Sequence, residues 1–172
     1  TLGYSLEQQM DAFRMFQANG FTDQKIKLYM PLNAPGETVQ TLLKTVEKIK
    51  ELYAMFGRDN VLPFIFFIGV QPGTPVERLL IGQGYLKPDY DPLTFNPFLI
   101  KKLLYNPKPL GRLIGRAYLE AIETSDPNGE YIGRATMDII ERELAKPEVV
   151  AACGGDSSPQ PADEPASCSC NA

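Results

Sequence analysis

The chain has 172 residues, 44% of them hydrophobic and 22% charged, which is typical of one globular domain with its own core. Its net charge of −4 excludes the basic surplus that binds nucleic acid by counterion release, and the absence of histidine excludes a serine–histidine–aspartate triad. No apolar run approaches the roughly 18 residues that a membrane span requires, so we expect neither a nucleic-acid partner nor a membrane span.

The first predicted element is a helix that begins after Ser5. Ser5 and Gln8 fit a capping box, apolar residues follow at helical spacing, and Gly20 ends the pattern. A strand follows over residues 26–32. Its Pro31 stands at the end, where the lost backbone donor costs least.

An amphipathic helix from Thr38 to about Phe56 separates this strand from a second one over residues 61–70. The second strand shows no alternation of apolar and polar residues, which is typical of a strand covered on both faces in a parallel sheet. Strands separated by such a helix form a βαβ unit, and a short helix over residues 74–81 follows. The sequence therefore predicts an α/β fold.

The pattern changes after Tyr85, where the strand signals stop. Residues 87–96 are rich in proline and aspartate, and helices are predicted over residues 98–105, 110–122 and 131–144. We expect residues 87–148 to form a helical extension packed on the α/β unit. From residue 149 the chain is rich in Gly, Ser, Pro and Ala with no Lys or Arg, so residues 149–172 are predicted to be a disordered tail.

The three cysteines, Cys153, Cys168 and Cys170, all fall in this tail. The folded part is therefore expected to contain no cysteine and no disulfide. Two thiolates one residue apart can chelate a soft metal, but a closed site needs four ligands and the chain has no histidine. The tail is interpreted either as a run of free thiols or as a segment that handles soft metals.

Two loops after the predicted strands are candidate binding elements. In Pro35-Gly36-Glu37-Thr38, the glycine lets a ligand approach the backbone, and the N–H groups at the next helix start favour polar or anionic groups. Glu37 can accept a bond from a ligand amine or hydroxyl. A tight turn in which Glu37 complements its own helix dipole explains the same residues.

The second loop is Pro72-Gly73-Thr74-Pro75. Thr74 can cap the following helix and Pro75 suits its first position, so the start of a helix explains this loop without a binding role. Loops after the carboxyl ends of parallel strands nevertheless carry the chemistry in barrels and doubly wound sheets.

The order of these motifs resembles the C-terminal third of a radical S-adenosylmethionine (radical SAM) enzyme core, and more narrowly the subgroup with a cobalamin-binding domain upstream. The resemblance rests on Pro-Gly-Glu-Thr at 35–38, Pro-Gly-Thr-Pro at 72–75 and Gly-Tyr-Leu at 84–86, and it covers roughly residues 1–86. It implies a partial (β/α)6 TIM-like barrel of which residues 1–86 supply the last strands. The missing N-terminal part of the barrel is then a partner.

The resemblance also implies cofactors. In that family three cysteines bind a 4Fe-4S iron-sulfur cluster, and S-adenosylmethionine on the cluster is cleaved to a 5′-deoxyadenosyl radical that acts on a small-molecule substrate. A reductant protein, and for the subgroup cobalamin-dependent methyl transfer, belong to this expectation. The cluster cysteines would fall before Thr1, so we expect a fragment of a longer chain that is inactive alone. A cytoplasmic location suits such oxygen-sensitive chemistry.

On this resemblance Asn33, Pro35, Gly36 and Glu37 line the cofactor site beside the adenosine part of S-adenosylmethionine, and Asn33 stands where many members have glycine. The residues that would face substrate or cobalamin are Gln71, Gly73 and Thr74. Two rival hypotheses are a non-catalytic scaffold or binding module that kept a remnant of the barrel, and a protein whose thiol tail binds soft metals.

Overall fold

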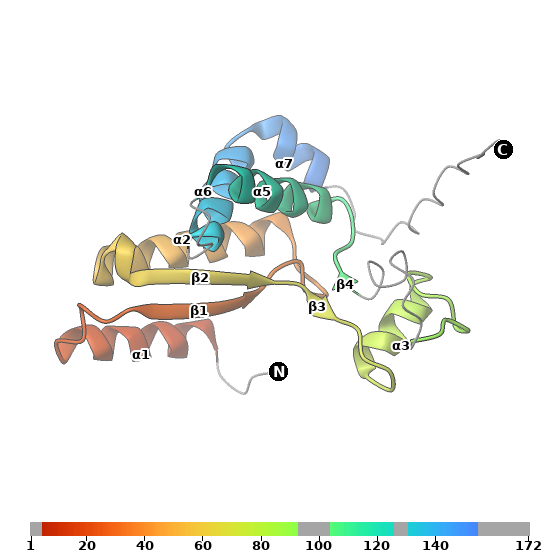
Figure 1. Ribbon diagram of the computed structural model, residues 1–172, viewed down its shortest axis with the longest axis horizontal. Helices are drawn as coiled ribbons and strands as arrows, with labels where there is room; N and C mark the ends of the chain where they lie inside the picture. The colour runs from red at the N-terminus through yellow and green to blue at the C-terminus, as the bar shows by residue number, and fades with distance from the viewer. Residues whose placement is uncertain (1–4, 93–103, 126–130, 155–172) are drawn as a thin grey trace.

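The computed structural model describes residues 5–92, 104–125 and 131–154. The part described is a mixed α/β structure with two small sheets and no closed barrel (Figure 1). Its elements in chain order are α1 (Leu6–Ala18), β1 (Ile26–Pro31), α2 (Val39–Phe56), the 3-10 turn η1 (Arg58–Asn60), β2 (Val61–Phe66), β3 (Ile68–Gly69), α3 (Pro75–Gly82), β4 (Leu104–Tyr105), α5 (Leu110–Thr124), α6 (Ile132–Leu144) and α7 (Pro147–Cys153).

The predicted βαβ unit is confirmed. Strands β1 and β2 pair in parallel, with Ile26 opposite Val61, and α2 connects them. The capping box of Ser5 and Gln8 is present, α2 begins after Thr38 as expected, and Thr74 caps α3 with Pro75 at its first turn. Local signals for the start of each helix therefore predicted these boundaries correctly.

One face of the β1–β2 sheet is covered. Ile26, Leu28 and Val61 pack with residues of α1 and α2, while Met30 and Ile65 join the main core. That main core unites α2 with α5 and α6, which stack beyond α2 (Figure 1). The opposite face is only partly covered, since Tyr29 is 69% and Phe66 is 45% exposed.

Helix α6 lies against the outer edge of β2. In a parallel pair alternate residues direct their backbone groups to the neighbour, and the Leu32 N–H donates to the Phe66 carbonyl at 3.0 Å. Pro63 lies three residues before Phe66, so its backbone groups point away from β1. The N–H that proline lacks would have no strand partner at this edge, so proline is tolerated there. A Cβ on Gly133 would lie 1.7 Å from the Pro63 carbonyl oxygen, so only glycine fits at this point of α6.

Three predictions about the chain after residue 60 are wrong. The strand expected over 61–70 is divided into β2 and β3, which pairs with β4 in a separate antiparallel sheet. The expectation that no strand follows Tyr85 is therefore wrong as well. Leu104 and Tyr105, which were expected to end a helix over 98–105, are extended. Residues 98–103 of that expected helix lie outside the described residues.

The tail prediction is wrong at its beginning. Residues 149–153 belong to α7, which starts at Pro147 and packs Val149, Val150 and Cys153 against the main core. A folded helix therefore does contain one cysteine, contrary to expectation. Residues 155–172, with Cys168 and Cys170, lie outside the described residues.

Candidate functional site

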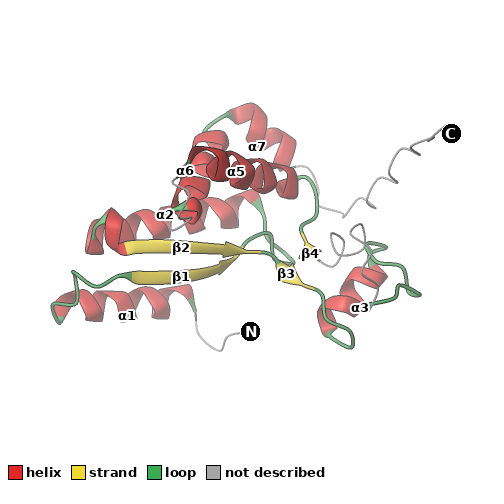
Figure 2. Ribbon diagram, viewed as in Figure 1, coloured by secondary structure: helices red, strands yellow, loops and turns green. Residues whose placement is uncertain are grey.

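A pocket of about 590 Å³ lies beside the loop that leaves the carboxyl end of β1. Figure 2 shows this loop next to the arrowheads of β1 and β2. The loop after β1 forms one wall, the segment before α5 forms another, and α3 and the end of α7 complete it. The lining residues are Asn33, Ala34, Pro35, Gly36, Glu37, Thr38, Val39, Gln40, Leu79, Gln83, Tyr105, Pro107, Lys108, Pro109, Leu110, Cys153 and Gly154.

Asn33 anchors this wall of the pocket. Its side chain and backbone are only 3% exposed to solvent. Its backbone has φ +56°, a left-handed conformation that asparagine tolerates better than most residues. Its side-chain Nδ2 donates to Asn106 Oδ1 at 2.7 Å and to the Pro107 carbonyl at 2.9 Å. Asn106 in turn donates to the Gly111 carbonyl at 3.3 Å. One amide therefore joins the loop after β1 to the start of α5.

Glu37 stabilises the same loop through hydrogen bonds to its backbone. Its carboxylate accepts the backbone N–H of Asn33, and its own N–H donates to the Ala34 carbonyl at 2.9 Å. Burial raises the pKa of Glu37, and the backbone bonds from Asn33 and Ala34 partly offset that rise. The carboxylate thus forms part of the pocket wall in a position where an added positive charge would stabilise its ionised form.

Gly36 leaves the backbone of this loop open to the pocket. It has φ +88°, and a Cβ built on it would meet no heavy atom within 4 Å. Conformation rather than space accounts for the glycine. Together with Pro35 it presents an uncovered stretch of main chain that a ligand can approach.

The residues predicted to face substrate or cobalamin, Gln71, Gly73 and Thr74, do not line this pocket. Thr74 accepts the Glu77 N–H at 3.2 Å and donates to the Gln71 carbonyl at 2.7 Å, while the Gly73 N–H donates to the Glu77 carboxylate at 2.7 Å. These bonds build the start of α3. The Tyr90 hydroxyl also donates to Glu77, which lowers the pKa of Glu77 and raises that of Tyr90 to about 12.

Helix α3 reaches the pocket through Leu79 and Gln83 instead of through its first turn. Sequence reasoning also missed Tyr105, Asn106 and the segment 107–110. Prolines 107 and 109 are typical of a break between two helices and carry no signal of a binding role. Asn106 lies 73 residues from Asn33 along the chain. No local signal connects positions that far apart, so this wall could be found only from the fold.

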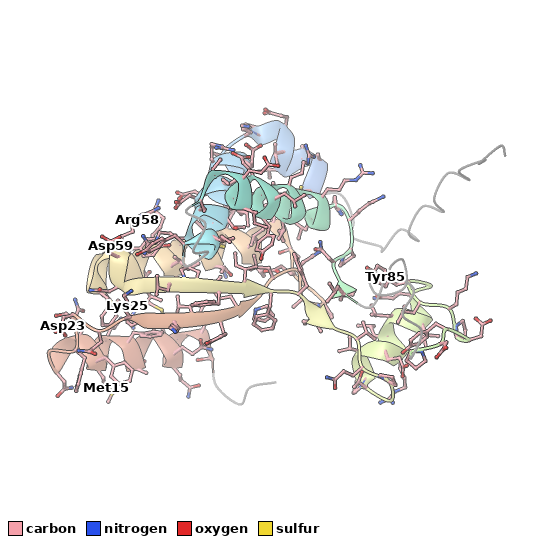
Figure 3. The ribbon with its side chains drawn as sticks, in the orientation of Figure 1. Met15, Asp23, Lys25, Arg58, Asp59 and Tyr85 are labelled. Carbon is pink, nitrogen blue, oxygen red and sulfur yellow. The ribbon has the colours of Figure 1, made fainter. Side chains whose placement is uncertain are left out.

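A second polar cluster lies at the amino end of the sheet, where Figure 3 shows Arg58 and Asp59 beside the start of β2 and Tyr85 at the other end with α3. Arg134, whose side chain is 10% exposed, donates to Asp59 at 3.0 Å and stacks over the Tyr131 ring at 4.7 Å. Within the described residues its Nε and Nη2 atoms, and the Tyr53 hydroxyl, are buried without a hydrogen-bond partner. These atoms line neither the pocket beside residues 33–38 nor the pocket between α5, α6 and α7.

The described residues suit the two implied cofactors differently. A 4Fe-4S cluster does not fit the described residues, because Cys153 is their only cysteine and they contain no group of three or more metal-binding side chains. S-adenosylmethionine does fit the pocket in size, since ligand pockets typically measure about 300–1,000 Å³. Its walls also combine apolar residues with exposed backbone and amide groups.

Comparisons with known proteins leave the family open. No family model matches the chain, and no curated protein or solved structure matches it either. Across residues 5–92, 104–125 and 131–154, no helix is long and apolar enough to cross a membrane.

Proposed function

We propose that this chain is the C-terminal portion of a radical SAM enzyme core and that the pocket beside residues 33–38 receives the adenosine part of S-adenosylmethionine. One observation carries the proposal: the Pro35-Gly36-Glu37-Thr38 loop lines a ligand-sized pocket at the carboxyl end of two parallel strands. This is where α/β folds bind their ligands.

The walls offer suitable groups for a nucleoside. Leu79, Pro109 and Leu110 provide apolar surface for a purine ring, and the backbone at Gly36 is open to its polar edge. S-adenosylmethionine carries a positive sulfonium and a positive amine, and the Glu37 carboxylate in the wall has the complementary charge. A bound cation there should lower the pKa of Glu37 towards its ordinary value.

Asn33 supports this reading of the loop. It stands where many members of the family have glycine, and it adopts the positive φ that favours glycine. The backbone path of the loop is therefore compatible with the family pattern despite the different residue. In this proposal Asn33 is a positioning residue, because its side chain is occupied by Asn106 and Pro107.

The proposal places the cluster, the reductant protein's docking site and any cobalamin on the missing N-terminal part of the enzyme. S-adenosylmethionine bound near such a cluster supplies a carbon radical that removes hydrogen from a substrate. The described residues of this chain hold the nucleoside and shield it from water. The uncovered sheet face at Tyr29 and Phe66 favours a partner over the rival scaffold hypothesis, because exposed aromatic residues next to an unpaired strand edge require covering.

The test is a titration of the 172-residue chain with S-adenosylmethionine, followed by amide chemical shifts in solution NMR. We expect shifts confined to the residues that form the pocket, at 33–40, 79, 83, 105–110, 153 and 154. Gly36→Val places a side chain into the pocket and should weaken binding about tenfold or more, as loss of shape complementarity in a pocket does.

Gly73→Val is the matched control. Gly73 also has a positive φ, +80°, with no heavy atom within 4 Å of a built Cβ, but it lies outside the pocket. Both variants carry the same backbone strain, so Gly73→Val should bind like the wild type. Equal binding by both variants, or shifts elsewhere, would contradict the proposed site.

A further inference from the structure

A second pocket, of about 480 Å³, lies between α5, α6 and α7 on the other side of Cys153. It is lined by Pro109, Arg112, Leu113, Arg116, Ala117, Glu120, Ile139, Glu143, Glu148, Val149, Ala152 and Cys153. Its floor is apolar, since Leu113, Ala117 and Ile139 are all buried members of the main core. Nothing in the function proposed above uses it.

Two arginines of α5 line this pocket above its floor. Arg112 and Arg116 lie one helical turn apart on α5, and among the described residues neither guanidinium has a hydrogen bond or an ion pair. Two like charges at this spacing disfavour a helix unless something neutralises them. Arg116 also acts on the thiol across the pocket, since its charge offsets part of the rise that burial causes in the pKa of Cys153.

The carboxylates of the pocket are mostly occupied already. Arg142 donates to both oxygens of Glu120, at 2.9 and 3.1 Å, and Lys146 donates to both oxygens of Glu143, at 2.8 and 2.9 Å. Glu148, in the first turn of α7, has no ion pair among the described residues. The two unpaired arginines and this one carboxylate leave one net positive charge for a ligand.

We propose that this second pocket binds a monoanionic amphiphile, an organic carboxylate with an extended apolar body. The carboxylate would bind Arg112 and Arg116, whose planar guanidinium groups match it in a bidentate arrangement. The apolar body would lie along this floor and cover Val149 and Ala152, which line the pocket and are not fully buried. The inference does not rest on the first pocket or on S-adenosylmethionine.

The probe is sodium decanoate, titrated into the 172-residue chain and followed by amide shifts, with 1-decanol as the uncharged match. Decanoate should shift residues 112–117 and 148–153, and it should bind more tightly than decanol. In the double variant Arg112→Gln, Arg116→Gln, decanoate binding should fall about tenfold or more, the loss expected for charge-assisted hydrogen bonds. Decanol binding should not change.

Lys44→Gln is the matched control, because it removes an exposed cation from α2, outside both pockets, and should bind decanoate like the wild type. Glu148→Gln keeps both arginines and should strengthen binding, so the proposal can be tested even if the double variant folds poorly. Equal decanoate affinity in the double variant and the wild type, weaker binding by Glu148→Gln, or tighter binding of inorganic phosphate than of decanoate would overturn it.

Discussion

Polar side chains are buried at both ends of the β1–β2 sheet, but the fold provides hydrogen-bond partners more completely at the carboxyl end than at the amino end. At the carboxyl end the side-chain amide of Asn33 donates one hydrogen bond to Asn106 and one to the Pro107 carbonyl, and the Asn33 backbone N–H donates to the Glu37 carboxylate. At the amino end Arg134 is almost as deeply buried, yet two of its nitrogen atoms have no partner among the described residues. Both amide N–H groups of Asn33 therefore have partners, whereas two nitrogen atoms of the Arg134 guanidinium carry a desolvation cost that no hydrogen bond offsets.

This difference has a consequence for function. A satisfied network holds a loop in one geometry, which is what a binding site requires, and the larger pocket lies beside it. The amino-end cluster joins η1 to α6 without lining either pocket, which suits a purely structural role.

Gly133→Ala should be the most damaging substitution, because the new Cβ would overlap the Pro63 carbonyl oxygen and push α6 away from the amino end of the sheet. We expect a loss of about 3 kcal/mol in the free energy of unfolding, or failure to fold. Chemical denaturation measures it. Gly115→Ala on α5 is the control, since its Cβ meets nothing within 4 Å and should add roughly 0.5–1 kcal/mol of stability. Similar losses for both would show that α6 does not pack this closely.

Asn33→Ala should cost roughly 2–3 kcal/mol, because it removes two hydrogen bonds and places a Cβ residue at positive φ without the side chain that compensates. Asn33→Gly separates the two causes. It loses the same bonds but suits the backbone, so it should recover about 1 kcal/mol of the loss. If alanine and glycine are equally destabilising in denaturation experiments, the positive φ is not the source of the second contribution.

Arg134→Met should cost much less than Asn33→Ala, within about 1 kcal/mol of the wild type. The substitution removes two buried donors that lack partners, and it leaves Asp59, whose side chain is 93% exposed, in contact with water. Removing these two unpartnered donors should stabilise the folded protein, and losing the hydrogen bond to Asp59 and the contact with the Tyr131 ring should offset that gain. The same denaturation series measures it. A loss larger than that of Asn33→Ala would mean that the buried guanidinium is well satisfied and that the two ends are alike.

Glu37→Gln should alter how stability depends on pH rather than stability at low pH. Burial raises the pKa of Glu37 above its ordinary value of 4.5, so the folded protein binds this proton more tightly than the unfolded chain does. The contribution of Glu37 is therefore most favourable below pH 4.5 and is lost as the pH rises through the raised pKa. The variant should gain stability relative to the wild type between about pH 4 and pH 7. A constant difference across this range would contradict the assignment.

Much of the fold follows from local patterns. Ser5, Thr38 and Thr74 each accept an N–H at the start of a helix, and such bonds depend only on residues three positions apart. The parallel pairing of β1 and β2 also follows from the apolar run and the intervening amphipathic helix. The caps are short-range effects, and the strand pairing follows from the order of successive elements, so a single sequence displays both.

The features that the sequence did not reveal are long-range contacts. The bond between Asn33 and Asn106 and the approach of Gly133 to Pro63 depend on how distant segments pack. The end of the chain illustrates the same limit. Residues 149–153 were expected to be disordered from their composition, but Val149, Val150 and Cys153 form a helix because the main core offers them a surface. The loop from 33 to 38 was identified from its motif, whereas the opposite wall of its pocket was not.

The position of α6 on the outer edge of β2 restricts how the sheet can be extended. A further strand cannot hydrogen-bond to β2 while the Gly133 backbone occupies the space beside Pro63, so new strands can join only at β1. Growth is then one-directional, with β2 as the permanent last strand. Any larger assembly built on this chain would be an open crescent rather than a closed ring, and its gap would lie on the side of α6.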